Sequence, residues 1–147
     1  MIPELSPTLR AFCDNEELLR LAYLDRHGYP RVLPVWFVMI DGAYYIGTSA
    51  TSAKWKAVQR DARVGWVIDG GTQGLYPDTL TAKGVSMRGR VEEVRDARER
   101  PRVYDALGQK SFTTTDHPKF IETYGHIDDG ATVCLRLVPE DGLMWEY

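Results

Sequence analysis

Short segments in which apolar side chains recur at every second position run through most of this chain. The clearest are Leu19-Leu21-Tyr23, Val64-Trp66-Ile68 and Val133-Leu135-Leu137. A period of two is that of a strand with one buried face. Asp41-Gly42, between two further apolar segments, is a strong signal for a tight antiparallel hairpin. Consecutive antiparallel strands favour an α+β fold built around a small barrel.

Turn and capping residues predict the remaining elements. We expect strands at 31–40, 43–48, 79–94, 131–138 and 143–147, with a bend near Gly84 or Gly89. Helices are expected at 6–14, 51–61, 96–107 and 117–124, with Pro101 marking either a break in the third or a new start there. Residues 69–77 contain three glycines and are predicted as a loop. The 147 residues show no repeat or linker, so we expect one domain over 1–147.

The segment Arg31–Ile40 is apolar on both faces of the predicted strand. A strand of this kind needs cover on both sides. In a small sheet, this pattern predicts the protein core on one side and a partner subunit on the other.

Composition excludes several classes of protein. The chain has 18 basic and 21 acidic residues and a net charge of −3, which disfavours a nucleic-acid binder. No apolar run reaches the roughly 20 residues that span a bilayer, and no secretory signal is visible at 1–10. Cys13 and Cys134 form neither a disulfide framework nor a zinc pattern. We therefore expect a cytoplasmic protein that does not bind membranes.

The histidines and reactive side chains do not form a catalytic or metal-binding motif. The spacing of His27, His117 and His126 does not match that of metal ligands. The sequence has no Gly-x-Ser-x-Gly nucleophile motif and no phosphate-binding loop that ends in Gly-Lys-Ser/Thr. We therefore assign no catalytic side chain and no metal ligand.

A hydroxyl-rich segment joins the predicted strand 43–48 to the predicted helix 51–61. It contains Thr48, Ser49, Thr51, Ser52 and Lys54. Hydroxyls and free backbone N–H groups at a helix start form an anion site. Lys54 would lie in the first turn, where the helix dipole disfavours a cation, and a bound phosphate would offset that cost. A capped surface helix with a solvated lysine explains the same residues, and spacing alone favours it.

The segment Pro34-Val35-Trp36-Phe37-Val38 has two interpretations. It could hold a flat aromatic ligand against backbone amides and apolar side chains. It could also be barrel core and dimer interface, and composition alone favours this second interpretation.

The order and spacing of these motifs resemble those of the flavin-binding split barrels related to pyridoxamine 5'-phosphate oxidase. The resemblance is clearest from about 17 to 94. It rests on Tyr23-Leu24-Asp25, Gly28-x-Pro30-Arg31-Val32-x-Pro34-Val35-Trp36-Phe37, Tyr45-Ile46-Gly47-Thr48-Ser49, Ser52-Ala53-Lys54, Arg60-Asp61-x-Arg63-Val64, Gly89-Arg90-Val91 and the final Trp145-Glu146-Tyr147.

This resemblance implies a six-stranded antiparallel split β-barrel with flanking helices that forms a homodimer with cofactor sites at its interface. The cofactor would be FMN or, in one branch, the deazaflavin coenzyme F-420. Thr48, Ser49, Ser52 and Lys54 match positions that hold the cofactor phosphate. The strand that lines the ring system would supply Pro34, Val35 and Trp36, and the second subunit would supply Trp145.

The implied function is hydride transfer between the flavin and a small flat substrate, with the cofactor carrying the chemistry. An F-420-dependent reductase is the alternative, since Lys54, Lys56, Arg60 and Arg63 could bind an acidic tail. A non-catalytic flavin, haem or tetrapyrrole binder is a further alternative. We do not expect oxidation of pyridoxamine phosphate, because no counterpart of the family's C-terminal Arg/His-bearing segment is visible.

Overall fold

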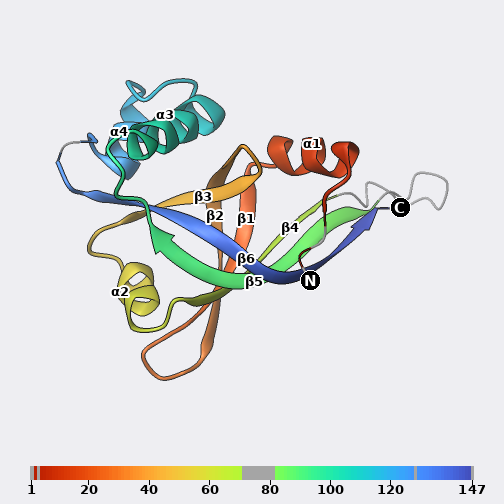
Figure 1. Ribbon diagram of the computed structural model, residues 1–147. Coiled ribbons are helices and arrows are strands. Elements are labelled where there is room, and N and C mark those ends of the chain that lie inside the picture. The colour runs from red at the N-terminus through yellow and green to blue at the C-terminus, as the bar shows by residue number, and fades with distance from the viewer. Residues whose placement is uncertain (1, 3, 71–81, 128, 147) are drawn as a thin grey trace.

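The computed structural model describes residues 2, 4–70, 82–127 and 129–146 and shows a closed six-stranded barrel (Figure 1). The strands follow the order β1-β2-β3-β6-β5-β4, and antiparallel pairing of β4 with β1 closes the barrel. Their bounds are Leu18–Leu24, Pro30–Ile40, Ala43–Ser49, Arg63–Gly70, Lys83–Glu93 and Thr132–Glu146 for β1 to β6. This arrangement confirms the predicted α+β barrel.

The hairpin between β2 and β3 forms at the predicted Asp41-Gly42 turn. Both residues have positive φ, 51° at Asp41 and 82° at Gly42. Two such residues in succession match the twist of the strands they join, and glycine takes this conformation at little cost. Met39 pairs with Tyr44, and Ile40 with Ala43, on either side of the turn.

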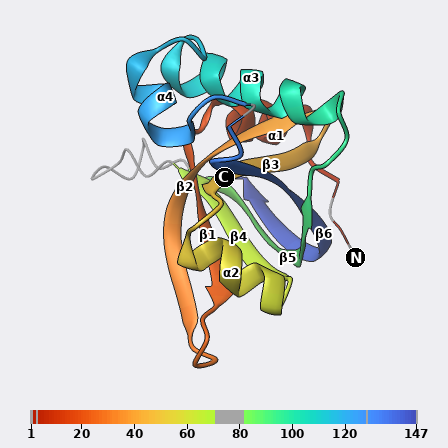
Figure 2. The same cartoon turned by 90° about the vertical axis from the view of Figure 1, so that its left-hand side faces the viewer.

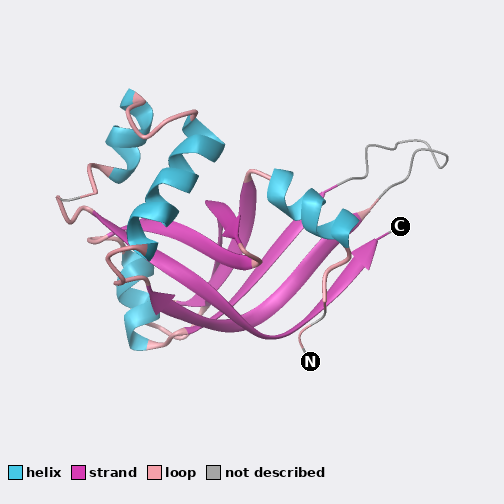
Figure 3. Cartoon of the chain, turned by 45° about the horizontal axis from the view of Figure 1, so that its top comes forward, coloured by secondary structure: helices cyan, strands magenta, loops and turns pink. Residues whose placement is uncertain are grey.

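In the described part of the chain, four helices flank the barrel (Figure 3): α1 (Pro7–Asn15), α2 (Ala53–Arg60), α3 (Glu99–Phe112) and α4 (Pro118–Tyr124). Ser6 and Ser52 cap the first two, each accepting a backbone N–H bond through its hydroxyl at 3.0 Å. Of the two alternatives predicted at Pro101, the break is wrong and the new start agrees with the structure, because α3 begins at Glu99. Pro101 lies in the first turn of α3, where a backbone N–H has no acceptor within the helix, so proline is tolerated there.

The predicted strands 131–138 and 143–147 are joined in one strand, β6, which is a correction; residue 147 lies outside the described residues. Between them, the register with β5 shifts, so that Gly89 faces Pro139 while Arg88 faces Asp141. A bulge of this kind adds a residue and bends a strand without ending it. The neighbouring strand, β5, is predicted at 79–94 and runs from Lys83 to Glu93 in the structure. Residues 79–81 of that prediction lie outside the described residues.

Two apolar cores explain which strand faces are buried. The first fills the barrel and contains Phe37, Ile46 and Trp66. The second lies between the barrel wall and the helices α3 and α4, which cover one side in Figure 2. Its members include Val38 and Tyr45, so β2 and β3 are buried on both faces in this region.

This arrangement corrects the second half of the prediction for Arg31–Ile40. From Val35 onward, helices of the same chain, rather than a partner subunit, provide the second cover. The preceding residues, Arg31–Pro34, are exposed, with Val32 at 63% of its full accessibility.

Candidate functional site

A cavity of about 480 Å³ lies where β3 ends and α2 begins. Seven of the eight residues proposed from the sequence line it: Pro34, Val35, Trp36, Thr48, Ser49, Ser52 and Lys54. Leu18, Gly47, Thr123 and Tyr124 complete the lining. The cavity therefore joins the hydroxyl-rich segment to the apolar strand β2.

The hydroxyls at the cavity form linked pairs. Thr48 Oγ1 lies 3.0 Å from Ser52 Oγ, and Ser49 Oγ lies 3.1 Å from Thr51 Oγ1. The Ser52 hydroxyl also accepts the backbone N–H bond of Trp55 that caps α2. The N–H groups of Ala53 and Lys54, in the first turn, have no acceptor within the helix. Hydroxyl groups and the start of α2 therefore lie at one end of the cavity.

Lys54 is a half-buried cation at this end of the cavity. Burial lowers the pKa of its ammonium group below 10.5, because a charged group loses solvation there. Within the described residues, its side chain has no hydrogen bond or ion pair. The positive end of the α2 dipole adds to the cost of placing a cation here. An anion in the cavity would reduce both costs.

The apolar side of the cavity is formed by β2. Val35 belongs to the barrel core, whereas Trp36 packs beneath α3 and α4, so their side chains point to opposite faces of the strand. The Trp36 indole N–H donates to Glu17 Oε1 at 3.2 Å, and its ring lies 5.2 Å from that of Phe112. These contacts hold the Trp36 ring in one orientation.

Sequence reasoning did not identify Tyr124 and Gly47 as cavity residues. They come together because the Tyr124 ring lies directly against the backbone of β3, where a Cβ at Gly47 would be 2.8 Å from Tyr124 Cε1. Gly47 belongs to the motif that carried the resemblance, so its position was visible in the sequence. The close approach of α4 was not visible in the sequence, because Tyr124 lies 77 residues further along the chain.

Trp145 lies apart from the other proposed site residues. It pairs with Gly84 near the end of β6, and its ring fills the space that a side chain at position 84 would need. In Figure 1 this end of β6 is on the opposite side of the barrel from α2. Within one chain, Trp145 therefore does not reach the cavity.

A second hollow of about 590 Å³ lies on the other side of α2, beside the β1–β2 hairpin. Arg26, Arg31, Lys56 and Arg60 line it. The four cations proposed for an acidic tail do not share one groove, because Lys54 lines the first cavity and Arg63 forms a 2.6 Å ion pair with Asp61. The contact between the Ser49 and Thr51 hydroxyls connects the edges of the two hollows.

Among the described residues, no group of three or more histidine, cysteine or acidic side chains is placed to hold a metal ion. No described helix has the length and apolar character needed to cross a bilayer.

Comparison with known proteins places this geometry in context. A sequence model of the family described as pyridoxamine 5'-phosphate oxidase matches residues 5–146. No match was found among curated protein sequences.

Several solved structures share the fold. The conserved hypothetical protein Rv2991 from Mycobacterium tuberculosis is 25% identical, with a TM-score of 0.77, covering 99% of this chain and 86% of that one. HutZ, the haem storage protein from Vibrio cholerae, is 19% identical, with a TM-score of 0.72 and coverage of 98% and 95%. An FAD-binding protein from Mesorhizobium loti is 22% identical, with a TM-score of 0.70 and coverage of 97% and 96%. Since the family model spans nearly the whole chain, the protein belongs to the pyridoxamine 5'-phosphate oxidase family.

Proposed function

We propose that this protein is a flavin-dependent oxidoreductase that binds FMN in the cavity between β2, β3 and α2. The observation that carries the proposal is Lys54, a half-buried cation beside a hydroxyl cluster, with no anionic partner among the described residues. A phosphate monoester supplies the missing negative charge and accepts several hydrogen bonds. The membership of the family and the FAD-binding neighbour support a flavin as the molecule that bears the phosphate.

The residues of the chain would divide the binding between them. Lys54, Ser49, Thr48 and the first-turn N–H groups of α2 would hold the phosphate. Pro34, Val35 and Trp36 would line the ring and exclude water from one of its sides. When bound, the flavin supplies hydride transfer to or from a small flat substrate. The protein's role is then to bind, orient and shield the reactants.

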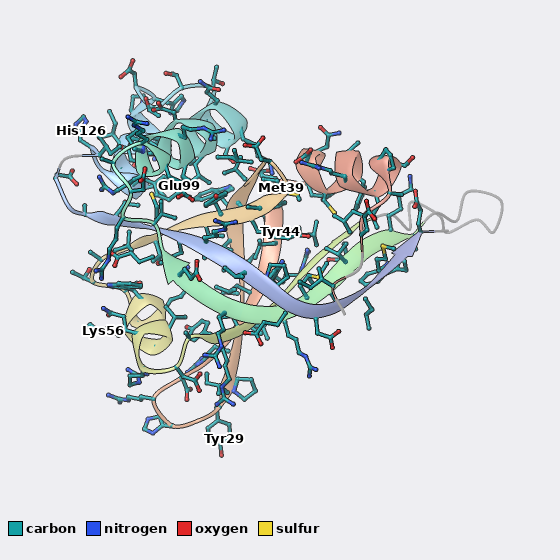
Figure 4. All side chains as sticks on the ribbon, viewed as in Figure 1. Tyr29, Met39, Tyr44, Lys56, Glu99 and His126 are labelled. Carbon is teal, nitrogen blue, oxygen red and sulfur yellow. The ribbon has the colours of Figure 1, made fainter. Side chains whose placement is uncertain are left out.

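We also propose that the protein acts as a homodimer with cofactor sites at its interface. The β1–β2 hairpin exposes apolar side chains next to the cavity, with Tyr29 at 70% and Leu33 at 38% of full accessibility. Tyr29 projects from the hairpin tip in Figure 4. A second copy that covers this hairpin would bury those side chains. It could also bring its own Trp145 to the cavity, which the Trp145 of the same chain does not reach.

An F-420-dependent reductase is the second candidate. The observation that favours it is the second hollow, where Lys56 and Arg60 have no ion-pair partner among the described residues. An acidic tail could extend from the phosphate cluster past Thr51 into this hollow. Lys56→Ala would then weaken F-420 binding and leave FMN binding unchanged.

The proposed function is tested by titrating the purified protein separately with FMN, F-420 and haemin and following absorbance. Saturable FMN binding, followed by flavin-dependent oxidation of NADH or NADPH with an added acceptor, would support the proposal. Preferential binding of F-420 would favour the second candidate. Binding of haemin alone would contradict both and indicate a haem-binding protein.

A further inference from the structure

We propose that the Tyr124 hydroxyl donates a hydrogen bond to an acceptor atom on the ring of the cavity's ligand and thereby positions that ring. This inference rests on the proposed function, which supplies a flat heterocycle with acceptor atoms at its edge. The hydrogen bond proposed for Tyr124 involves only the ring of the ligand. It is separate from the contact proposed between Lys54 and the phosphate.

The ring of Tyr124 is held firmly. It is 4% exposed, and its centroid lies 5.0 Å from that of Phe120, 6.1 Å from that of Phe112 and 6.3 Å from that of Trp36. The backbone is fixed as well, because its carbonyl accepts a hydrogen bond from the Thr132 hydroxyl. A ring enclosed in this way has little rotamer freedom, so its hydroxyl has a nearly fixed position.

The hydroxyl itself has no partner within the described part of the chain, although the ring is buried. The Tyr124 hydroxyl is nevertheless accessible. Among the described residues, the side-chain nitrogen and oxygen atoms that are both inaccessible and without a hydrogen-bond partner are Trp66 Nε1, Lys110 Nζ and Ser111 Oγ, and the Tyr124 hydroxyl is not one of them. Tyr124 lines the cavity, and we infer that its hydroxyl faces this space. An unpaired phenol in a partly dry site favours a ligand that accepts its hydrogen bond.

The protonation state suits a donor. Burial raises the pKa of the Tyr124 phenol above its ordinary value of 10, and the nearby Cys134 adds to the effect. The hydroxyl therefore keeps its proton throughout the physiological pH range. It remains a hydrogen-bond donor when Lys54, in the proposed phosphate site, loses its proton.

The test is Tyr124→Phe, which keeps the packed ring and removes only the hydroxyl. We expect the Kd to rise about 5- to 15-fold for FMN and by the same factor for riboflavin, since riboflavin shares the ring and lacks the phosphate. The visible absorption bands of bound flavin should shift, because they respond to hydrogen bonds at the ring. The melting temperature should not fall, because the aromatic contacts remain.

Tyr44→Phe is the matched control. Tyr44 is also a buried tyrosine, at 3% exposure, but its ring packs against Trp66 in the barrel core and does not line the cavity. Removing its hydroxyl should leave flavin affinity and spectra unchanged.

The outcomes separate the two proposals. If wild-type protein binds both flavins and Tyr124→Phe binds them with the same Kd and the same spectra, the role of Tyr124 is wrong and the proposed function stands. If the wild type binds neither flavin, both proposals fall. A loss confined to FMN would also contradict the role proposed for Tyr124, because it would place the hydroxyl at the phosphate.

Discussion

Lys54 shows how a single residue can indicate a ligand. An ammonium group at a helix N-terminus is opposed both by the helix dipole and by partial burial. Surface lysines usually avoid such positions or pair with a carboxylate. Here the nearby groups are hydroxyls and backbone N–H donors, which cannot neutralise the charge. In the proposed function, Lys54 is one half of an ion pair whose other half is the phosphate of the ligand.

This arrangement predicts how FMN affinity depends on pH. Burial lowers the pKa of Lys54, and a bound phosphate would raise it again, so phosphate binding is strongest while Lys54 is protonated. FMN affinity should therefore fall as pH rises through the lowered pKa toward 10.5. The measurement is the ratio of the riboflavin Kd to the FMN Kd, followed from neutral to alkaline pH. The two ligands share the ring, so the effect of its titration cancels in this ratio.

Lys54→Arg is the control for this prediction, because a guanidinium group stays charged throughout that range. The ratio should fall with pH in the wild type and stay nearly constant in Lys54→Arg. A wild-type ratio that does not change with pH would contradict an ammonium–phosphate contact.

At the scale of elements, the site depends on the close approach of α4 to β3. The Tyr124 ring occupies the space where a side chain at Gly47 would project. The ring is packed among other aromatic rings and cannot move aside easily. The absence of a Cβ at position 47 therefore sets the width of one end of the cavity.

Gly47→Ala should consequently lower both stability and flavin affinity. The new methyl group would meet Tyr124 at 2.8 Å, and overpacking of this kind costs about 1–3 kcal/mol. Thermal unfolding and FMN titration check the two effects. Gly65→Ala is the matched control, because a Cβ on that strand glycine would meet its nearest atom, Met87 O, at an ordinary 3.5 Å. Equal melting temperatures for the two variants would contradict the account.

Local signals allowed much of the fold to be predicted from the sequence. The Asp41-Gly42 turn depends on neighbouring residues, so the sequence alone is sufficient to identify it. The same holds for the starts of the first two helices, whose caps the sequence narrows to Ser6 and to Thr51 or Ser52. The residues proposed to hold a phosphate were also visible, because Thr48 to Lys54 are close together in the chain.

The errors arose where distant segments decide the outcome. The cover on Trp36 and Val38 comes from α3 and α4, which no local pattern connects to β2. Continuity of β6 past Pro139 depends on its pairing with β5 through a bulge. Tyr124 belongs to the cavity only because α4 folds back onto Gly47. In each case, a long-range contact overrides or supplements the local preference.

At the scale of the whole molecule, the exposed apolar side chains of the β1–β2 hairpin are the feature that contacts within a single chain do not explain. Val32 is 63% exposed and Leu33 38% exposed on a strand that continues directly into the cavity wall. Contiguous apolar side chains of this kind commonly mark an interaction surface. The proposed homodimer uses this surface and completes the cofactor site.

Val32→Glu should therefore produce a monomer that binds FMN more weakly, because a charged side chain at an apolar interface loses solvation without gaining a partner. Sedimentation or light scattering gives the mass, and FMN titration gives the affinity. Ala11→Glu, at an exposed position of α1, is the control and should leave both unchanged. A wild-type protein that is already monomeric and binds FMN tightly would contradict the interface.

The most direct measurement is a cycle of calorimetric titrations that combines two proteins with two ligands: wild type and Lys54→Ala, each with FMN and riboflavin. A charge-assisted bond to phosphate predicts that Lys54→Ala loses about 1.5–3 kcal/mol toward FMN, roughly a 10- to 150-fold rise in Kd. Riboflavin affinity should not change, and neither affinity should change in Arg102→Gln, which removes an exposed charge on α3 outside the cavity. Equal losses for FMN and riboflavin, or no loss for either, would contradict the assignment of this cavity as a flavin phosphate site.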